Sequence, residues 1–349
     1  MVYNTSVIVA FEQFDDKYWF LKNQLLWAIL GLGVGLFVSN ISYKLIQKYA
    51  LHAFVVSFIM TVLVLIPGFS NEVYGARNRL VIPGIPFLQS ISIQPSEIIK
   101  LTLVMYLAAL LTPVLLKKSV KFPHKEFLVL LAATLLVVAL EPDLGNAILI
   151  AASAGTIYFA AGAPMTYVLG IGGVGSLSAI IYALSTEYRR ARILTFLNPT
   201  TNNESISYHI QQIFIALGSG GILGLGLGNS RQKYQYLPEV TTDSIFAIVG
   251  EELGLIGAVL VIGALVFIIW RGFRIAAQTQ DPFAKLLALG ITTNIAVQTI
   301  VNLGGMVGIM PLTGVPLPFV SYGGTSLTIL LVSVGILLSI SRTLGKKTA

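Results

Sequence analysis

The stretch GNSRQKYQYLPEVTTDSIFAIVGEELGLIG, residues 228–257, passes from a polar loop into a long apolar segment. The loop carries Arg231 and Lys233, and the apolar segment runs from Ser244 to Trp270. About 20 mostly apolar residues are enough for a helix to cross the hydrocarbon core of a bilayer. The stretch therefore predicts a charged loop that leads directly into a transmembrane helix.

Three carboxylates mark the mouth and the interior of this predicted span. Asp243 lies at its mouth beside the basic loop, and Glu251 and Glu252 lie inside it. An ionisable side chain within a span is costly and by default indicates a functional site. We expect Asp243 to be the exposed carboxylate of the three, held at the mouth of the span. Glu251 and Glu252 are expected to support the site by pairing or hydrogen bonding inside the helix bundle.

The composition is that of a polytopic membrane protein with an all-α fold. Of the 349 residues, 55% are hydrophobic and 11% are charged, and the mean hydropathy is +0.83. A soluble domain carries about 25% charged residues. The absence of cysteine excludes disulfides, thiolate catalysis and cysteine-based metal sites. No cofactor and no metal site is expected, and a divalent cation is possible but has no support in the sequence.

Nine spans are predicted in a single integral membrane domain over residues 1–349. The segments that are long and apolar enough lie near 24–40, 50–66, 97–116, 126–140, 145–161, 166–184, 244–270, 285–303 and 324–341. No phosphate-binding GxxxxGK[ST] motif accompanies them, so the sequence does not support nucleotide hydrolysis.

The distribution of Lys and Arg over the loops predicts the orientation. One set of alternate loops carries twelve basic and two acidic residues, and the other carries nine basic and ten acidic residues. Because Lys and Arg favour the cytoplasmic side, the first set is assigned to the cytoplasm, together with the C-terminus. The net charge of +7 is thus explained by topology, and no nucleic-acid partner is expected.

The outer side then holds the long connecting segments, 67–96, 185–243 and 304–323. Connections as long as 185–243 are usually functional or disordered. Its middle, Tyr208 to Leu217, is apolar enough to lie along the membrane interface or to re-enter the membrane. The glycines of GSGGILGLGLG, residues 218–228, favour close backbone packing.

Charged pairs and turns supply further candidate site residues. Glu97 and Lys100 are three residues apart at the start of a span, so they share one helix face. They either bind a ligand in a cavity or only neutralise each other. In EPDLG, 141–145, Pro142 and Gly145 are expected to form a tight turn. There Asp143 is either an ordinary helix cap or a ligand for sugar hydroxyls or a cation.

Basic side chains on the outer side are candidates for phosphate binding. Arg190 lies in YRRAR, and Arg77 lies in the first long outer segment. The guanidinium fork matches the geometry of phosphate oxygens, although a solvated or headgroup-facing patch explains such residues equally well.

The stretch PLTGVPLPFVSYGGTS, residues 311–326, precedes the last span and contains three prolines and three glycines. Proline interrupts regular helix, so this stretch is predicted to be irregular. Irregular backbone at membrane depth persists only where it is buried in protein or lines a watery cavity. Ser321 and Tyr322 are therefore candidate contacts in a cavity wall.

These motifs together resemble one family, the SEDS proteins of shape, elongation, division and sporulation. The matching segments are QPSEIIKL (94–101), EPDLG (141–145), RRARILTFLNP (189–199), LPEVTTDSIFAIVGEELG (237–254) and PLTGVPLPFVSYGGTSL (311–327). The N-terminal stretch and the loop around Arg231 are more similar to the division branch than to the elongation branch.

The resemblance implies a glycosyltransferase that polymerises lipid II into peptidoglycan strands on the outer face of the bacterial cytoplasmic membrane. The family's essential aspartate falls on Asp243, which would act as general base on the acceptor sugar. The residues expected to contact substrate are Arg77, Glu97, Lys100, Asp143, Arg190, Arg231, Lys233, Glu239, Ser321 and Tyr322. The implied partners are lipid II, a class B penicillin-binding transpeptidase and other division proteins. The transpeptidase is expected to dock on the last two spans, which are rich in small residues.

The chain also departs from the family pattern. The family has ten spans and a cytoplasmic N-terminus, so the first span is expected to be missing here. Thr241, Ser244 and Glu141 stand where the family usually has His, Phe and Gln. Two alternatives to a polymerase remain, a lipid II flippase and a non-catalytic division scaffold. Clustering of the charged residues on one side disfavours the flippase, which needs opposed gates.

Overall fold

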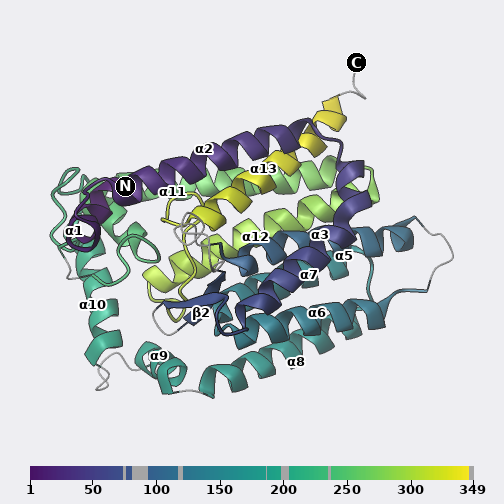
Figure 1. The fold of residues 1–349 in the computed structure, drawn as a ribbon, viewed down its shortest axis with the longest axis horizontal. Coiled ribbons are helices and arrows are strands. Elements are labelled where there is room, and N and C mark those ends of the chain that lie inside the picture. Colours follow the sequence, from purple (N-terminus) through teal and green to yellow (C-terminus); the bar gives the residue numbers. More distant parts are fainter. Residues whose placement is uncertain are drawn as a thin grey trace. The chain divides into compact units, whose positions relative to one another are not determined.

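The computed structural model describes residues 1–73, 76–80, 93–116, 121–185, 187–197, 204–234 and 237–345. They divide into two compact units. Unit 1 comprises Met1–Ala28, Leu177–Ile268 and Gln298–Gly323, and unit 2 comprises Ile29–Ser176, Ile269–Val297 and Gly324–Ala349. Figure 1 shows the path of the chain through both.

Each of the nine predicted spans falls on one helix, which confirms the all-α polytopic fold. The helices are α2 (Trp19–Asn40), α3 (Tyr43–Val64), α5 (Pro95–Leu115), α6 (His124–Leu140), α7 (Leu144–Ala160), α8 (Met165–Leu184), α11 (Ile245–Gln278), α12 (Pro282–Met306) and α13 (Gly324–Gly345). Seven of them are long and apolar enough to cross a membrane. The other two, α6 and α7, have 17 residues each. The chain is therefore a multi-pass membrane protein.

The connecting segments contain more regular structure than the sequence indicated. A helix α1 (Val2–Phe14) precedes α2, and the outer segment 185–243 contains α9 (Glu187–Leu197) and α10 (Glu204–Ser219). The segment 67–96 contains an antiparallel hairpin of β1 (Ser70–Val73) and β2 (Ala76–Leu80). No strand was predicted there, because its polar residues and glycines do not show the apolar alternation typical of strands.

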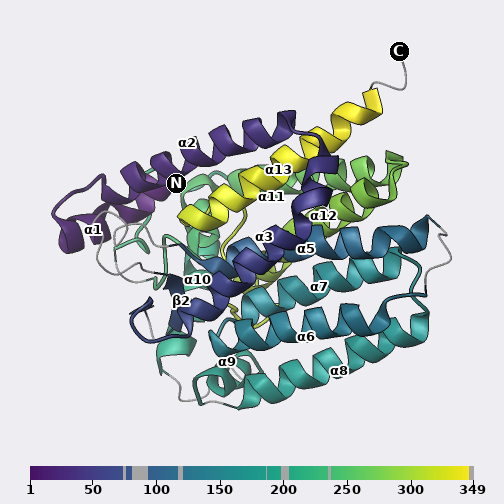
Figure 2. The same cartoon turned by 45° about the vertical axis from the view of Figure 1, so that its right-hand side comes forward.

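Helix α5 is the centre of unit 2 and contacts α3, α7 and α13. Its buried face repeats every four residues, at Ile99, Leu103, Leu107 and Leu111, and each of these side chains is at most 1% exposed. Four-residue spacing keeps side chains on one face of a helix. Figure 2 shows α5, α6 and α7 running side by side.

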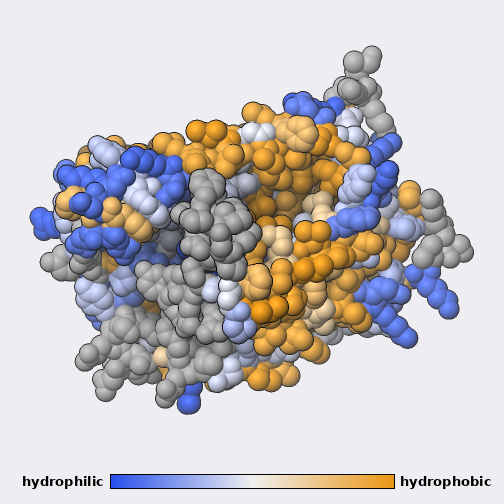
Figure 3. Space-filling view, in the orientation of Figure 1, coloured by the Kyte–Doolittle hydropathy of each residue, from blue (hydrophilic) through white to orange (hydrophobic). Residues whose placement is uncertain are grey.

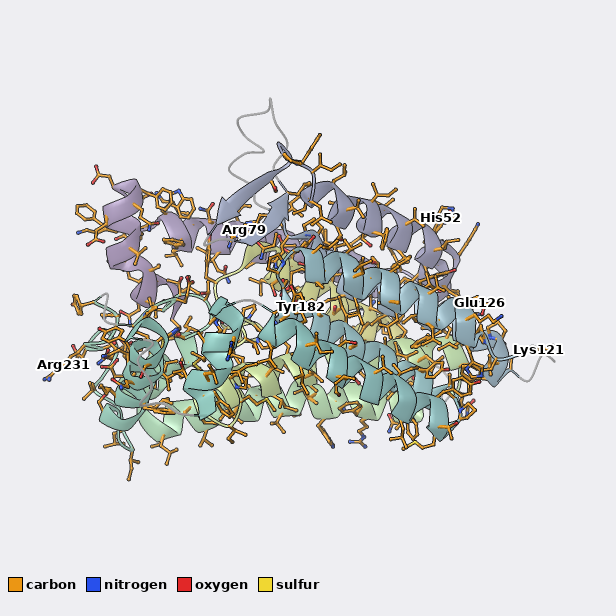
Figure 4. All side chains as sticks on the ribbon, turned by 90° about the horizontal axis from the view of Figure 1, so that it is seen from below. His52, Arg79, Lys121, Glu126, Tyr182 and Arg231 are labelled. Carbon is orange, nitrogen blue, oxygen red and sulfur yellow. The ribbon has the colours of Figure 1, made fainter. Side chains whose placement is uncertain are left out.

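The surface of unit 2 has the pattern expected in a bilayer. Apolar residues cover the visible faces of α3 and α13 in Figure 3, and exposed side chains such as Val56 and Ile59 contribute to this surface. Figure 4 places His52, Lys121 and Glu126 toward one end of this unit and Arg79 toward the other. This separation agrees with the assignment of the corresponding loops to opposite sides.

In unit 1, α11 is interrupted at Gly254, whose backbone is not helical (φ 65°, ψ −165°). The glycine-rich segment that precedes α11 hydrogen-bonds the backbone groups freed by this break. Leu225 N donates to Glu251 O (3.0 Å), and Gly226 N donates to Glu252 O (3.0 Å). On the other side of the break, Leu255 N donates to Gly221 O (2.9 Å). Unpaired backbone groups are not tolerated in lipid, so this pairing allows a broken helix at membrane depth.

Two glycines make this contact possible. A Cβ on Gly224 would lie 2.2 Å from Glu252 O, and a Cβ on Gly254 would lie 2.3 Å from Gly224 N. Both residues also have positive φ. The prediction that glycines of 218–228 serve close backbone packing is confirmed at Gly224, and Gly254 was not part of it.

The first prediction compares two glycine substitutions. Gly224→Ala should lower the free energy of unfolding by about 2–4 kcal/mol, because the methyl group overlaps the backbone of α11 and the left-handed conformation is strained. Gly263→Ala is the matched control, since an added Cβ on Gly263 in α11 meets no atom within 4 Å. Thermal unfolding of the purified protein in detergent measures both. Equal melting temperatures for the two variants would contradict the packing described here.

Candidate functional site

Asp243 lies immediately before the first turn of α11 in unit 1, and its side chain is partly exposed. Its backbone is held from α12, where Asn302 Nδ2 donates to Asp243 O (3.0 Å) and to Val315 O (2.7 Å). One amide of α12 thus ties the mouth of α11 to the irregular segment 311–323.

The segment 311–323 contains no helix, as predicted, and it pairs with the residues around Asp243. Ser321 Oγ donates to Thr242 O (2.6 Å) and accepts from Leu317 N (2.8 Å). Tyr322 N donates to Thr241 O (2.9 Å). These bonds hold the segment against the mouth of α11.

Two candidate substrate contacts therefore have structural partners. The hydroxyl of Ser321 already donates and accepts a hydrogen bond, and the side chain is only 5% exposed. The ring of Tyr322 packs edge-on against Phe20, with 5.0 Å between the centroids. The hydrogen bonds and the burial of Ser321 do not favour direct binding of substrate by its hydroxyl group. Gly314 lies beside the Asp243 carboxylate, since its added Cβ would lie 3.5 Å from Asp243 Oδ2.

Gln24 on α2 is a supporting residue that the sequence did not reveal. Its Nε2 donates to Ser321 O (3.3 Å), and its Oε1 accepts from Gly323 N (3.3 Å). Glutamine near the start of a span has no distinguishing pattern, so only the fold identifies it.

Glu251 and Glu252 lie at the break of α11 and are each 1% exposed. Glu251 accepts from Ser230 Oγ and from Arg231 N (2.9 Å). Glu252 accepts from Ser230 N (3.3 Å) and from Asn4 Nδ2. The expected role of these glutamates, hydrogen bonding inside the bundle, is confirmed, and it anchors the basic loop to α11.

Lys233 belongs to the same network. Its ammonium donates to Gly228 O (2.6 Å), Asn4 Oδ1 (3.0 Å) and Glu252 Oε1 (3.4 Å), and the residue is 6% exposed. A lysine has three N–H donors, and all three are engaged. The structure therefore does not favour the predicted binding of substrate by Lys233.

The remaining candidates of unit 1 lie at its surface. Arg231 is exposed and its side chain points away from the helices in Figure 4. Arg190 is exposed on α9. Glu239 is exposed, and its carboxylate accepts from Thr242 Oγ1 (2.8 Å). Arg190 and Arg231 thus remain accessible to an anionic ligand.

In unit 2, Glu97 and Lys100 form the predicted pair. Lys100 Nζ lies 2.9 Å from Glu97 Oε1, and both side chains are almost fully buried. A buried pair is a weak indicator of stability, because desolvation of the charges offsets their attraction. The pairing is confirmed, while its role in substrate binding stays a prediction.

Asp143 is the N-cap of α7. Its carboxylate accepts from Asn146 N (2.9 Å), Asn146 Nδ2 (2.7 Å) and Gln94 Nε2 (3.2 Å). Burial raises the pKa of Asp143 above its usual range, and the hydrogen bonds from Asn146 oppose this shift. Gly145 already lies inside α7, so the expectation that it forms the turn was wrong. The cap itself, formed by Asp143, sets the start of the helix.

Glu141 is the titratable group that the sequence did not single out as a site residue. It is 0% exposed, and a hydrogen bond from Ser96 only partly opposes the effect of this burial on the pKa of its carboxyl group. Burial, together with the neighbouring charge of Asp143, raises the pKa of Glu141 to about 9. Glu141 is therefore a neutral carboxylic acid at neutral pH.

Arg77 and the acidic and histidine side chains complete the survey of candidate ligand-binding groups. Arg77 lies on β2, and its side chain is outside the described ones. Within the described residues, no three His, Cys, Asp or Glu side chains form a group suited to a metal ion. The chemistry offered by unit 1 is thus a partly exposed carboxylate at a helix N-terminus, on a rigid backbone.

A model of the protein family described as cell cycle protein, which covers FtsW, RodA and SpoVE, matches residues 1–346. The chain belongs to this family. The match confirms the resemblance to the SEDS proteins that the motifs indicated.

Relatives and solved structures agree with the family. A probable peptidoglycan glycosyltransferase FtsW of Geobacter metallireducens is 38% identical over 98% of this chain and 90% of its own length. The stage V sporulation protein E of Bacillus subtilis is 38% identical over 98% of this chain and 92% of its own length. A chain from a structure on the coordination of polymerization and crosslinking by a peptidoglycan synthase complex has a TM-score of 0.74 at 25% identity, covering 98% of this chain and 95% of that one. RodA of Thermus thermophilus shares the fold, with a TM-score of 0.68 at 23% identity over 98% of this chain and 93% of its own.

The second prediction concerns Glu141 and pH. Its raised pKa means that its contribution to stability is fully present below pH 4.5, the ordinary pKa of the group, and is lost as the pH rises toward 9. The loss amounts to at most about 1.4 kcal/mol per pH unit. Glu141→Gln cannot titrate, so its advantage in melting temperature over the natural chain should grow between pH 5 and pH 9. Asp15→Asn, at an exposed carboxylate, is the control that should leave the pH profile nearly unchanged. Parallel profiles for Glu141→Gln and the natural chain would show that Glu141 is not held neutral.

Proposed function

We propose that the chain is a peptidoglycan glycosyltransferase that polymerises lipid II into glycan strands during septal wall synthesis. Relatives that are 38% identical over 98% of this chain carry the glycosyltransferase name. The observation that carries the proposal is Asp243, a partly exposed carboxylate whose backbone is fixed by α12 and which adjoins the segment 311–323. Such a group suits proton transfer, which depends on placement to within hydrogen-bond distance of the substrate.

In the proposed reaction, Asp243 takes the proton of the 4-hydroxyl group of the acceptor sugar. The hydroxyl oxygen forms a bond to the anomeric carbon of the donor, and the bond from that carbon to the lipid pyrophosphate breaks with inversion. A positioned base typically contributes about 10²–10⁴-fold to the rate. The chemistry requires no redox cofactor, and dependence on a divalent cation stays open to test.

The leaving pyrophosphate gains negative charge, which basic side chains stabilise. Arg190 and Arg231 are exposed on the outer segments, and their guanidinium groups match phosphate oxygens. They are better candidates for this role than Lys233, whose donors are engaged. Glu97, Lys100 and Asp143 are proposed to act on the sugars or to hold the surrounding helices.

The proposed location is the bacterial cytoplasmic membrane, with the site outward and the C-terminus in the cytoplasm. The excess of Lys and Arg in one set of loops supports this orientation. The proposed partners are a class B penicillin-binding transpeptidase and other division proteins. A solved chain of similar fold comes from a complex concerned with both polymerization and crosslinking.

The third prediction tests the base. Asp243→Asn should reduce polymerisation of purified lipid II by at least about 10²-fold, because the amide cannot accept the proton of the hydroxyl group. Folding and membrane insertion should be unchanged, since the backbone bonds of Asp243 remain. Asp15→Asn makes the same chemical change at an exposed site and should retain full activity. Glycan strands from Asp243→Asn at the natural rate would remove Asp243 from the mechanism.

For the docking site of the transpeptidase, the fold offers a second candidate surface beside the one that the sequence indicated. The sequence placed it on the last two spans because of their small residues. Within unit 2, however, Gly335 of α13 already packs against Gly35 of α2, where an added Cβ would lie 2.2 Å from Gly35 O. In the most apolar stretch of α12, 72% of the residues are buried, whereas in that of α8 only 6% are buried. Small residues allow close helix approach in lipid, and the glycines of α8, such as Gly172, have no atom within 4 Å of an added Cβ.

The fourth prediction follows from this comparison. A photo-crosslinking residue at Val174 on α8, which is 67% exposed, should capture the transpeptidase in membranes that contain both proteins. Leu338 on α13, 43% exposed, tests the earlier placement, and the buried Leu286 of α12 is the control. Capture from Leu338 alone would return the docking site to α13, and capture from none of the three would contradict docking on either surface.

A further inference from the structure

The outer helices α9 and α10 of unit 1 contact each other, and each sends one side chain to a segment beside Asp243. From α10, a ring nitrogen of His209, Nε2, lies 2.8 Å from Ser244 Oγ. From α9, Arg192 Nη1 donates to Leu312 O (3.2 Å). Ser244 directly follows Asp243, and Leu312 begins the segment whose Gly314 adjoins Asp243 Oδ2.

Neither His209 nor Ser244 is suited to react with substrate itself. Ser244 is 0% exposed, so its hydroxyl does not reach a ligand. Burial, and to a smaller extent the charge of Arg192, lowers the pKa of His209 to about 4. The imidazole is therefore neutral near pH 7 and serves as a hydrogen-bond partner rather than as an acid.

We propose that His209 and Arg192 are positioning residues for Asp243. His209 fixes the first turn of α11 through Ser244, and Arg192 fixes the segment 311–323 through Leu312. This inference rests on the proposed function, because it assigns Asp243 the part of the reacting base. Sequence motifs did not show it, since His209 belongs to no charged cluster and its partner lies 35 residues away.

The physical reason is the sensitivity of proton transfer to geometry. A displacement of about 1 Å in a reacting group can cost about 10²-fold in rate. Asp243 stands at a helix end, where the backbone has few intrahelical hydrogen bonds. Its position therefore depends on bonds from outside α11, and His209 supplies one to the adjoining residue.

The experiment measures kcat and KM for purified lipid II with variants of the pair His209–Ser244. His209→Leu and Ser244→Ala should each lower kcat by about 10- to 10²-fold, with KM and melting temperature nearly unchanged. His209→Gln keeps a polar atom near the position of Nε2 and should retain most of the activity. The double variant should lose no more than either single variant, because one interaction is removed in each case.

The outcomes separate this inference from the proposed function. If Asp243→Asn is inactive while His209→Leu and Ser244→Ala keep their natural kcat, the positioning role is overturned and the base remains. If Asp243→Asn is fully active, the proposed base fails whatever the other variants do. A raised KM at natural kcat, or losses that add in the double variant, also overturns the positioning role. Where His209→Leu does not fold, Ser244→Ala decides, because it removes only one hydroxyl group.

Discussion

The backbone pairing at the break of α11 is the constraint on which unit 1 depends. A helix interrupted in lipid leaves amide and carbonyl groups that each cost several kcal/mol if unpaired. Here the glycine-rich segment supplies the missing partners, and it comes close enough only because Gly224 and Gly254 have no side chains. The same segment leads into the loop of Ser230 and Lys233. The side chains of these two residues bond to Glu251 and Glu252 and attach the loop to α11. The buried glutamates thus belong to the architecture of the break and not to the reaction.

This arrangement explains how irregular backbone can present a carboxylate with a defined position. Asp243 stands between the packed interior of α11 and the segment 311–323, and backbone or amide bonds reach its surroundings from α12 and α2. The core of unit 1 is apolar, and one buried cluster includes Phe246 and Val249 of α11, Ile213 of α10 and Leu317. Packing of this kind leaves little room for displacement. On a flexible loop, a carboxylate would vary more in position than Asp243 does in this packed arrangement.

The sequence predicted what depends on local pattern, and it failed where distant segments meet. The nine apolar helices, seven of them long enough to span a membrane, the pair Glu97–Lys100 and the irregular segment 311–323 follow from hydropathy, helical spacing and proline content. Gln24 and His209 could not be found in this way, because their partners are 297 and 35 residues away. The small residues of α13 have a role that composition did not indicate. Their composition suggested an external partner, and one of them, Gly335, also packs closely on Gly35 of α2 within the chain.

The described structure stabilises its carboxylates in different ways, and the comparison singles out Asp243. Glu97 pairs with an ammonium, Glu251 and Glu252 accept several hydrogen bonds, and the buried Glu141 keeps its proton. In each of these arrangements the carboxyl group is buried and its charge is paired, hydrogen-bonded or neutralised. Asp243 differs, because its side chain stays partly exposed while its main chain is fixed. A carboxylate in that condition can exchange a proton with a bound sugar, and the surrounding network serves to keep it there.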